Sequence, residues 1–413
     1  MFFRLRLTVV AFSLALAGTL CWGIFSPSLA QTPCHNQAHA VDSRLNLIAA
    51  SDHANWLHDS WLAYRERFIQ ADGRVIDRQD NQRSISEGQA YAMLRAVMIN
   101  DQETFRRTFD WGEINLARQT SEGQPMDQLW AWLWGQSNDN RWGILDSNFA
   151  TDADIDAATA LILAARRWNC PAYLSIARRK LADIWDYGTV ELADGQRQLI
   201  PGPKQAFWPQ ENLLILNPSY FAPSSFRLFA QVDPERDWLA LVESGYSMLE
   251  ASSAASMAGL PSDWIGYDPG SDAYRLLPWN HPLESRYSFD AYRVWWRLAL
   301  DATWFGEERA QRYLEEHLPP LIERWQAEQT IPARLSLANV PLSDYEATAQ
   351  YAMLYPALRL VAPDIAQQIY QQKLKPNYSN GFWDNNNAYY TQNLAWFGLL
   401  PPELPAMLLY PEG

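Results

Sequence analysis

The stretch Ser86-Glu87-Gly88-Gln89 opens a run of residues with helical periodicity that continues to Ile99, and the fold can be worked out from this point. Ser86 and Gln89 have the spacing of a capping box, in which the serine would be the N-cap and the glutamine would lie at N3. An acidic side chain in the first helical turn, such as Glu87, is favoured by the helix dipole. The tetrapeptide therefore predicts a helix start, and helix capping alone accounts for its residues.

A second acidic helix start lies in Ala-Thr-Asp-Ala-Asp at 150–154. The residues that follow are rich in Ala and Leu and have helical periodicity, which predicts an amphipathic helix over Asp152–Trp168. Thr151 and Asp154 resemble a second capping box, with Asp in place of the usual Glu or Gln. Asp152 and Asp154 can therefore be explained as ordinary first-turn acids.

A third acidic helix start is Phe-Asp-Ala-Tyr-Arg at 289–293, which begins a helix predicted over Asp290–Trp304. Asp290 again fits the first turn, and Arg293 three residues later could form an ordinary surface ion pair with it. Other acidic residues lie in loop-like segments and are expected to be solvated rather than catalytic: Glu211, Asp263, Asp268 and Asp272.

The spacing of the three sites indicates how the helices are arranged. Glu87 and Asp152 are 65 residues apart, and Asp152 and Asp290 are 138 residues apart, close to twice that separation. Helical hairpins of about 60 residues each, somewhat longer than the usual repeated units, would produce this spacing. If the inner helices of such hairpins run parallel around a barrel, their N-termini meet at one end and all three acids could line one groove. An acid and a base in one place are what hydrolysis of a glycosidic bond requires.

Helical periodicity dominates the rest of the chain as well. It predicts helices over His53–Ile69, Glu87–Ile99, Thr104–Leu116, Pro171–Tyr187, Tyr220–Phe229, Arg236–Ala251, Glu308–Glu316, Tyr345–Leu354, Pro363–Leu374 and Tyr390–Phe397. Strand signals are confined to two short hairpins, at 73–77 and 196–200. Because strands and helices do not alternate, a doubly wound sheet is excluded. No linker is evident, so residues 51–413 are predicted to form one all-α domain.

The composition limits the kinds of partner. The formal net charge of −14 makes nucleic acid a poor partner. A neutral polymer is compatible with this charge, and a polyanionic one is disfavoured. The chain has 20 Trp and 19 Tyr, most of which are expected in helix–helix cores and a minority in a groove where they stack on sugar faces. The six scattered His and the lack of a Cys/His cluster predict neither a metal ion nor a cofactor.

The N-terminus has the pattern of a targeting segment. Arg4 and Arg6 precede an uncharged, mostly apolar stretch over Leu7–Ile24, and small residues before 31 predict cleavage after Ala30. Residues 1–30 are thus read as a signal peptide for export to the periplasm or medium, with an uncleaved anchor as the alternative. Residues 31–50 form a polar lead-in. Export would allow Cys34 and Cys170 to pair, which the sequence leaves open.

The motifs together resemble glycoside hydrolase family 8, the bacterial family of cellulases and related endoglucanases. The resemblance runs from about Trp56 to Phe397 and rests on several segments in the family's order. These are Ser86–Leu94, which is similar to the catalytic-acid motif, Ala150–Asp154 continued through Ala164–Trp168, which resembles the family signature, and Asn217–Phe221, Phe289–Arg293 and Gln392–Gly398.

The resemblance implies an (α/α)6 barrel and an inverting endo-1,4-β-glucanase. Glu87 would be the general acid that protonates the leaving glycosidic oxygen, and Asp290 the general base that activates water on the opposite face. Asp152 would hold and help to distort the sugar at the cleavage point. Substrate contacts would come from Trp132, Asp154, Trp208, Arg293, Tyr389 and Tyr390.

Two positions depart from the family pattern. Ala157 stands where the signature usually carries Ile or Met, which is a change of packing. Phe289 precedes the proposed base where many relatives have Tyr. The missing hydroxyl could change how water or Asp290 is held, which bears on rate and substrate preference more than on the reaction class.

Other functions stay open at this point. Chitosan, mixed-linkage glucan and xylan are alternative substrates of the same fold. A non-catalytic glycan-binding protein of exopolysaccharide assembly is a second alternative, although acids at all three sites argue against it. A structural barrel in a membrane complex is a third, and it would leave an aromatic groove unexplained. Exported members of the family accompany bacterial cellulose synthases, so association with the cell envelope or with cellulose-synthesis machinery is a further open partner.

Overall fold

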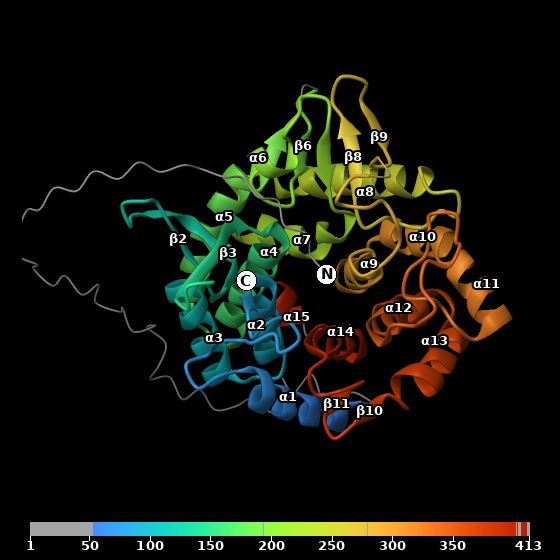
Figure 1. Cartoon of the computed structure of the whole chain (residues 1–413), viewed down its shortest axis with the longest axis horizontal. Helices are drawn as coiled ribbons and strands as arrows, with labels where there is room; N and C mark the ends of the chain where they lie inside the picture. Colours follow the sequence, from blue (N-terminus) through green and yellow to red (C-terminus); the bar gives the residue numbers. More distant parts are fainter. Residues whose placement is uncertain (1–52, 193, 279, 402, 404–405, 411–413) are drawn as a thin grey trace, which may run out of the picture.

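The computed structural model describes residues 53–410, except 193, 279, 402 and 404–405 (Figure 1). The predicted signal peptide and polar lead-in lie outside the described residues. Cys170 is disulfide-bonded, and the other two cysteines of the chain, Cys21 and Cys34, also lie outside the described part. Among the described residues, no helix is both long and apolar enough to cross a lipid bilayer.

Within the described residues, six helices form a closed inner ring whose consecutive members are in contact (Figure 1). The ring closes where Tyr91 packs edge-on against Phe397 and Arg95 donates to Asn393. The inner helices are α2 (Ser86–Met98), α4 (Thr151–Arg167), α7 (Pro223–Val232), α9 (Tyr292–Phe305), α12 (Thr348–Val361) and α14 (Tyr389–Leu399).

A second layer of helices surrounds this ring, and each outer helix packs mainly on one inner helix. Five of these pairs are consecutive in sequence, and the sixth joins the N-terminal α1 to the C-terminal α14. The predicted (α/α)6 barrel is therefore confirmed. The outer helices are α1 (Ala54–Phe68), α3 (Gln102–Asn115), α5 (Pro171–Tyr187), α8 (Trp238–Ala254), α10 (Glu308–His317) and α13 (Pro363–Ile369), which continues as a π-helical turn over Tyr370–Leu374.

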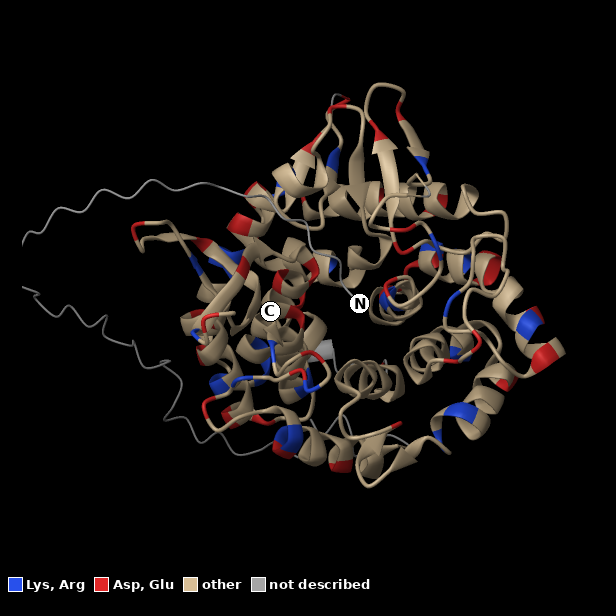
Figure 2. Ribbon diagram, in the orientation of Figure 1, with Lys and Arg blue, Asp and Glu red and all other residues tan. Residues whose placement is uncertain are grey.

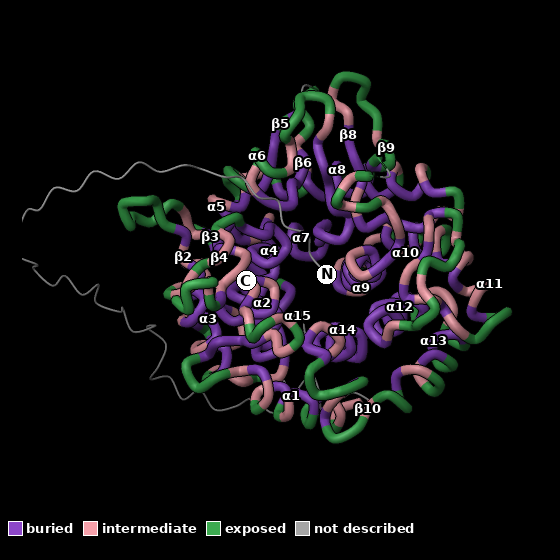
Figure 3. Tube along the Cα trace, viewed as in Figure 1, coloured by how far each residue is buried: buried purple, intermediate pink, exposed green. Residues whose placement is uncertain are grey.

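The composition of each helix explains its layer. Nearly all residues of α4 are buried, and its small residues, such as Ala157, Ala160 and Ala164, allow close packing on both sides. The outer helix α10 instead buries one stripe, Ala310, Tyr313 and Leu314, at helical spacing. Figure 3 shows the resulting buried inner ring, and Figure 2 shows charged residues mainly around it, with a few on α4 and α9 near its centre.

The strands were largely missed by the sequence analysis. The long hairpin of β3 and β4 is wrongly absent from the prediction, whereas the hairpin expected at 196–200 is present as β5 and β6. The strands are β1 (Ser84–Ile85), β2 (Ala117–Gln119), β3 (Pro125–Gln136), β4 (Trp142–Phe149), β5 (Thr189–Glu191), β6 (Arg197–Leu199), β7 (Leu214–Leu216), β8 (Ile265–Asp268), β9 (Ala273–Arg275), β10 (Tyr378–Ser379) and β11 (Phe382–Trp383).

The antiparallel sheet of β1, β2, β3 and β4 matters most for function, because β1 leads directly into α2. Ile85, opposite Leu133 of β3, is the N-cap residue of α2, and its extended conformation sets the direction in which the helix starts. Three short helices complete the described fold: α6 (Lys204–Phe207), α11 (Pro319–Glu328) and α15 (Ala406–Leu409), with a 3₁₀ turn over Pro218–Tyr220.

Candidate active site

Glu87 lies in the first turn of α2, but the predicted capping box is wrong. Ser86 is fully buried, and its hydroxyl donates to the Glu87 carboxylate at 3.2 Å rather than capping a backbone amide. The Gln89 amide is also buried, where it donates to the carbonyls of Gly73 and Thr108 and accepts from the Val75 amide. These bonds join the N-terminus of α2 to the preceding loop, through Gly73 and Val75, and to α3, through Thr108.

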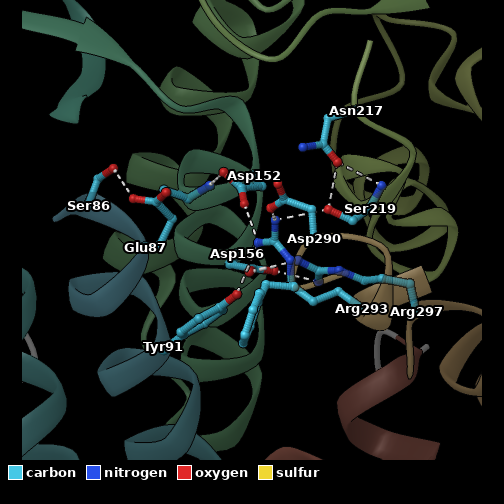
Figure 4. A network of polar contacts seen from close by, with 12 residues as sticks. Ser86, Glu87, Tyr91, Asp152, Asp156, Asn217, Ser219, Asp290, Arg293 and Arg297 are labelled. Atoms are coloured by element: carbon cyan, nitrogen blue, oxygen red, sulfur yellow. Dashed lines mark hydrogen bonds and ion pairs between the residues drawn. The ribbon is translucent and has the colours of Figure 1, made fainter. Parts of the chain in front are cut away.

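Asp152 and Asp290 are brought together by Arg293. The guanidinium of Arg293 donates to the Asp152 carboxylate at 2.6 Å and to the Asp290 carboxylate at 2.7 Å (Figure 4). Asp152 is 1% exposed, whereas the side chain of Asp290 is 33% exposed. The three acidic segments therefore meet at one end of the barrel, as their spacing predicted, with Asp152 enclosed and Asp290 open to solvent.

Arg293 is a buried hub rather than half of a surface ion pair. It also donates to the Ser219 hydroxyl at 2.9 Å, and that hydroxyl donates to Asn217. Its other terminal nitrogen contacts the Tyr91 hydroxyl at 3.3 Å. Charge-assisted bonds to two carboxylates hold this cation rigidly.

One helical turn further along α9, Arg297 forms a second buried ion pair. Its guanidinium donates to both oxygens of Asp156, at 2.6 and 2.8 Å. Such bidentate geometry fixes the position of α9 against α4, and with it the arginine above. Sequence analysis missed Asp156 and Arg297, although Asp156 lies one turn from Asp152 on α4 and Arg297 one turn from Arg293 on α9.

Asp290 itself lies just before its helix instead of in the first turn. The helix α9 begins at Tyr292, and Ala291 occupies the N-cap position. A turn in which the Tyr292 amide donates to the Ser288 carbonyl leads into the helix. The side chain of Asp290 therefore leaves from a turn and reaches back to Arg293.

The electrostatics distinguish Glu87 from its neighbours. Burial, reinforced by the negative charge of Asp152, raises the pKa of Glu87 to about 8. Burial also raises the pKa of Asp152, but the positive charge of Arg293 opposes this effect. Glu87 can therefore carry a proton at neutral pH, which a general acid must do.

Tyr220 lies close to the acidic group. Arg293 packs over its ring at 5.3 Å, and the charges of Asp152, Glu87 and Asp290 act with burial to raise its pKa well above the ordinary value. The Asn217–Phe221 segment was recognised from sequence as a block, but no role for its tyrosine was predicted.

Aromatic side chains extend from Tyr220. The ring centroids of Tyr220 and Trp264 are 6.3 Å apart, and the ring of Phe207 stacks on that of Trp264 with the centroids 5.9 Å apart and an interplanar angle of 5°. Trp208, a predicted sugar contact, follows Phe207 and is partly exposed, with Lys204 over its ring at 4.6 Å. Tyr220, Trp264 and Phe207 thus form a chain of aromatic rings that begins beside the acids, and aromatic side chains next to a few polar groups are typical of ligand sites.

The other predicted sugar contacts lie on β3 and α14. Trp132 is partly exposed in the middle of β3. Tyr389 is buried against α2, so closely that a Cβ on Gly88 would lie 1.6 Å from its hydroxyl. Tyr390 donates from its hydroxyl to the Phe289 carbonyl at 2.5 Å, next to Asp290.

Asp154 is the one predicted sugar contact that is fully enclosed. Its carboxylate pairs with Lys180 at 2.9 Å and accepts from the Trp130 amide at 3.1 Å. The predicted second capping box is wrong as well, because the Thr151 hydroxyl donates to the Ile200 carbonyl instead. Asp154 thus ties α4 to α5 and β3, with no exposed surface for a ligand.

One acid was assigned wrongly. Asp263 is 4% exposed and accepts hydrogen bonds around the turn that carries Asp290, whereas its loop position had suggested a solvated side chain. No local sequence signal marks it, because its partners are 25 and 28 residues away. Among the described residues, no group of three or more His, Cys, Asp or Glu is arranged to hold a metal ion.

Comparison with known proteins places this arrangement in a family. The model of glycosyl hydrolases family 8 matches residues 36–402. The chain is similar to an endoglucanase of Pseudomonas fluorescens (strain SBW25), with 30% identity over 369 residues that cover 81% of this chain and 90% of that protein.

Solved structures agree. An endo-1,4-D-glucanase from Vibrio fischeri ES114 superposes with a TM-score of 0.69 at 26% identity, over 82% of this chain and 93% of that one. A β-1,3-1,4-glucanase from Paenibacillus sp. X4 has a TM-score of 0.69 at 17% identity, over 90% of this chain and 93% of that one, which is a likeness of fold alone. The chain therefore belongs to glycosyl hydrolases family 8.

Proposed function

We propose that this chain is an endo-acting hydrolase that cleaves β-1,4-linked glucan with inversion of configuration. The observation that carries the proposal is the arginine bridge between Asp152 and the open Asp290, beside a Glu87 whose pKa is raised to about 8. The names of the relatives, endoglucanase and endo-1,4-D-glucanase, support the choice of substrate.

Each acid has a separate task in this mechanism. Glu87 donates its proton to the glycosidic oxygen as the bond to the anomeric carbon breaks. Asp290 takes a proton from a water molecule that attacks the same carbon from the opposite face. Asp152, which is 1% exposed, helps to hold and distort the sugar at the cleavage point by fixing Arg293 and through its own negative charge.

The solvent exposure of the acids suits these tasks. A general base for water needs access to solvent, and Asp290 has it. A general acid needs a proton at working pH, and burial supplies it at Glu87. The aromatic rings of Tyr220, Trp264 and Phe207, which contact one another in this order, would offer flat apolar surfaces for glucose units beside the acids.

The test is product release from carboxymethylcellulose, barley β-glucan, chitosan and xylan by the wild type and by Glu87→Gln. An amide keeps the shape of Glu87 but has no acidic proton, so the variant is expected to lose activity by a factor of about 10²–10⁴ and to retain glucan binding. Glu103→Gln, in the exposed first turn of α3, is the matched control and should keep full activity.

The outcomes are distinct. Cleavage of the glucans that disappears only in Glu87→Gln supports the proposal, and release of the α-anomer, followed by NMR, supports inversion. Cleavage of chitosan or xylan alone would keep the mechanism and replace the substrate. Tight glucan binding without cleavage of any polymer would favour the glycan-binding alternative.

We also infer that the protein is exported. The disulfide at Cys170 supports this, because such bonds persist in oxidising compartments outside the cytoplasm. Fractionation of cells that produce the full-length chain tests it, since a cytoplasmic protein would contradict the inference. Co-purification with envelope fractions after a high-salt wash would indicate the association with the cell envelope or cellulose-synthesis machinery.

A further inference from the structure

The turn that carries Asp290 is held from outside by another buried carboxylate. Asp263 accepts hydrogen bonds through one oxygen from the backbone amides of Ser288 at 3.0 Å and Ala291 at 2.9 Å. Its second oxygen accepts from the Ser288 hydroxyl. These donors belong to Ser288, before Asp290, and to Ala291, after it, so one side chain binds the turn on both sides of Asp290.

The helix after this turn lacks a cap of its own. A helix leaves its first backbone amides without partners, and a Ser, Thr, Asp or Asn at the N-cap normally accepts from one of them. Here the N-cap residue is Ala291, which has no side-chain acceptor. The first helical amides, of Tyr292, Arg293 and Val294, donate to carbonyls of the turn itself. The amide of Ala291 instead donates to Asp263, which lies 28 residues earlier in sequence, so a different segment of the chain fixes the residue between Asp290 and the helix.

The position of Asp263 is itself well defined. It is 4% exposed, and Arg286 lies 3.6 Å from its second oxygen. The residue after it, Trp264, is fixed as well, because its carbonyl accepts from the hydroxyls of Ser262 at 2.9 Å and Ser285 at 2.7 Å. Burial, together with the charge of Asp290, raises the pKa of Asp263 to about 7, whereas the bond from Ser288 opposes this shift.

The turn is also held at Phe289, whose carbonyl accepts from the Tyr390 hydroxyl at 2.5 Å. Asp290 is therefore flanked on both sides by residues whose backbone is fixed by distant side chains, and its own carboxylate is fixed by Arg293. Of these anchors, Asp263 is the only one that binds both flanks of Asp290 within the described residues.

We propose that Asp263 is a positioning residue for Asp290, which aims the base carboxylate at the attacking water. This inference rests on the proposed function, because it assigns Asp263 a task only if Asp290 is the base. Asp263 does not touch the substrate in this scheme. It acts by keeping the turn rigid, and small displacements of a catalytic group are costly, about 10²-fold in rate for roughly 1 Å.

The test compares steady-state kinetics of Asp263→Ala and Asp263→Asn with the wild type on the polymer that the wild type cleaves. The alanine variant removes every acceptor and is expected to lower kcat by about 10²-fold. The asparagine variant keeps an acceptor for the two backbone amides but loses the charge and the bond from the Ser288 hydroxyl, so a decrease of about tenfold is expected. KM should stay unchanged in both, because the base acts on water and not on the bound sugar.

Two further measurements separate positioning from a general loss of structure. In the Asp290→Ala background, Asp263→Ala should lower kcat by no more than about twofold, since a residue that acts through Asp290 has no effect once Asp290 is gone. Asp101→Ala is the matched control. Asp101 accepts from the Thr104 amide, Trp61 and Arg65 at the opposite end of α2, so its loss should reduce stability and leave kcat intact.

If Asp263→Asn has the kcat of the wild type, the inference is overturned. This outcome is decisive even if Asp263→Ala fails to fold. A full additional loss in the Asp290→Ala background, or an increase in KM with kcat unchanged, would overturn it as well. A wild type that cleaves no polymer would remove the proposed function and this inference together. If the wild type is active and the Asp263 variants have the same kcat as the wild type, only this inference is overturned and the proposed function stands.

Discussion

Replacement of Glu87 by Gln should stabilise the fold while it abolishes activity, and the gain should depend on pH. The folded protein holds a proton on Glu87 up to a pKa of about 8, whereas the unfolded chain releases it near the ordinary value of 4.5. Between these two values the folded state binds more protons than the unfolded state. The free energy of unfolding of the wild type therefore falls as pH rises through this window.

The magnitude follows from the two pKa values. Each pH unit inside the window costs the wild type at most about 1.4 kcal/mol, because one unit of pKa corresponds to that free energy. Glutamine has no proton to release and escapes this cost. The variant should be more stable by up to about 3 kcal/mol at pH 7, and by less than about 1 kcal/mol at pH 5. Partial exposure of Glu87 makes these values upper limits.

The assay is urea denaturation of both proteins at pH 5, 6, 7 and 8, followed by tryptophan fluorescence. Glu103→Gln serves as control, because Glu103 is exposed and its replacement should not change how the free energy of unfolding depends on pH. A difference in stability between Glu87→Gln and the wild type that is the same at every pH would refute the argument. It would mean that Glu87 is ionised in the folded state at neutral pH and is poorly suited to act as an acid.

Two other predictions follow from the same structure. The value of kcat/KM should decline above about pH 8, because Glu87 then loses its proton. In Asp152→Asn this decline should begin at lower pH, because the negative charge that helps to raise the pKa of Glu87 is gone. A decline that begins at the same pH in both proteins would contradict the assignment of Glu87 as the general acid. Lys180→Met leaves the Asp154 carboxylate buried without its ion-pair partner, so the free energy of unfolding measured in urea titrations should fall by about 3–5 kcal/mol. The kcat of the folded variant should stay near the wild-type value. A loss of activity without a loss of stability would show instead that Asp154 binds the substrate.

The sequence predicted the helices well where their signals are local. The helix α5 has the predicted bounds, Pro171–Tyr187, because a proline in the first turn marks its start. The same rule explains a failure: Pro319 was read as punctuation, yet it begins α11. The hairpin of β3 and β4 was missed although Trp130, Trp132 and Trp134 alternate along it, and this period of two residues is the local signal that would have predicted the strand.

The candidate site divides in the same way. Glu87, Asp152 and Asp290 could be picked out because each stands at or near a helix start, and because their spacing matches whole helical hairpins. Their different environments could not be predicted. Asp154 has the same local pattern as Asp152, yet Lys180 of α5 encloses it, whereas Arg293 of α9 holds Asp152 beside the other acids.

By itself, therefore, the sequence determined most of the helical segments, their order and which acids stand at or near their starts, since these signals act over a few residues along the chain. The tertiary structure alone decided that Glu87 keeps its proton, that Asp154 is enclosed and that Asp263 holds the turn of Asp290. The physical reason is that desolvation and ion pairing depend on whichever side chains the barrel brings close, and these partners lie between 25 positions (Asp263 and Ser288) and 65 positions (Glu87 and Asp152) apart in the sequence.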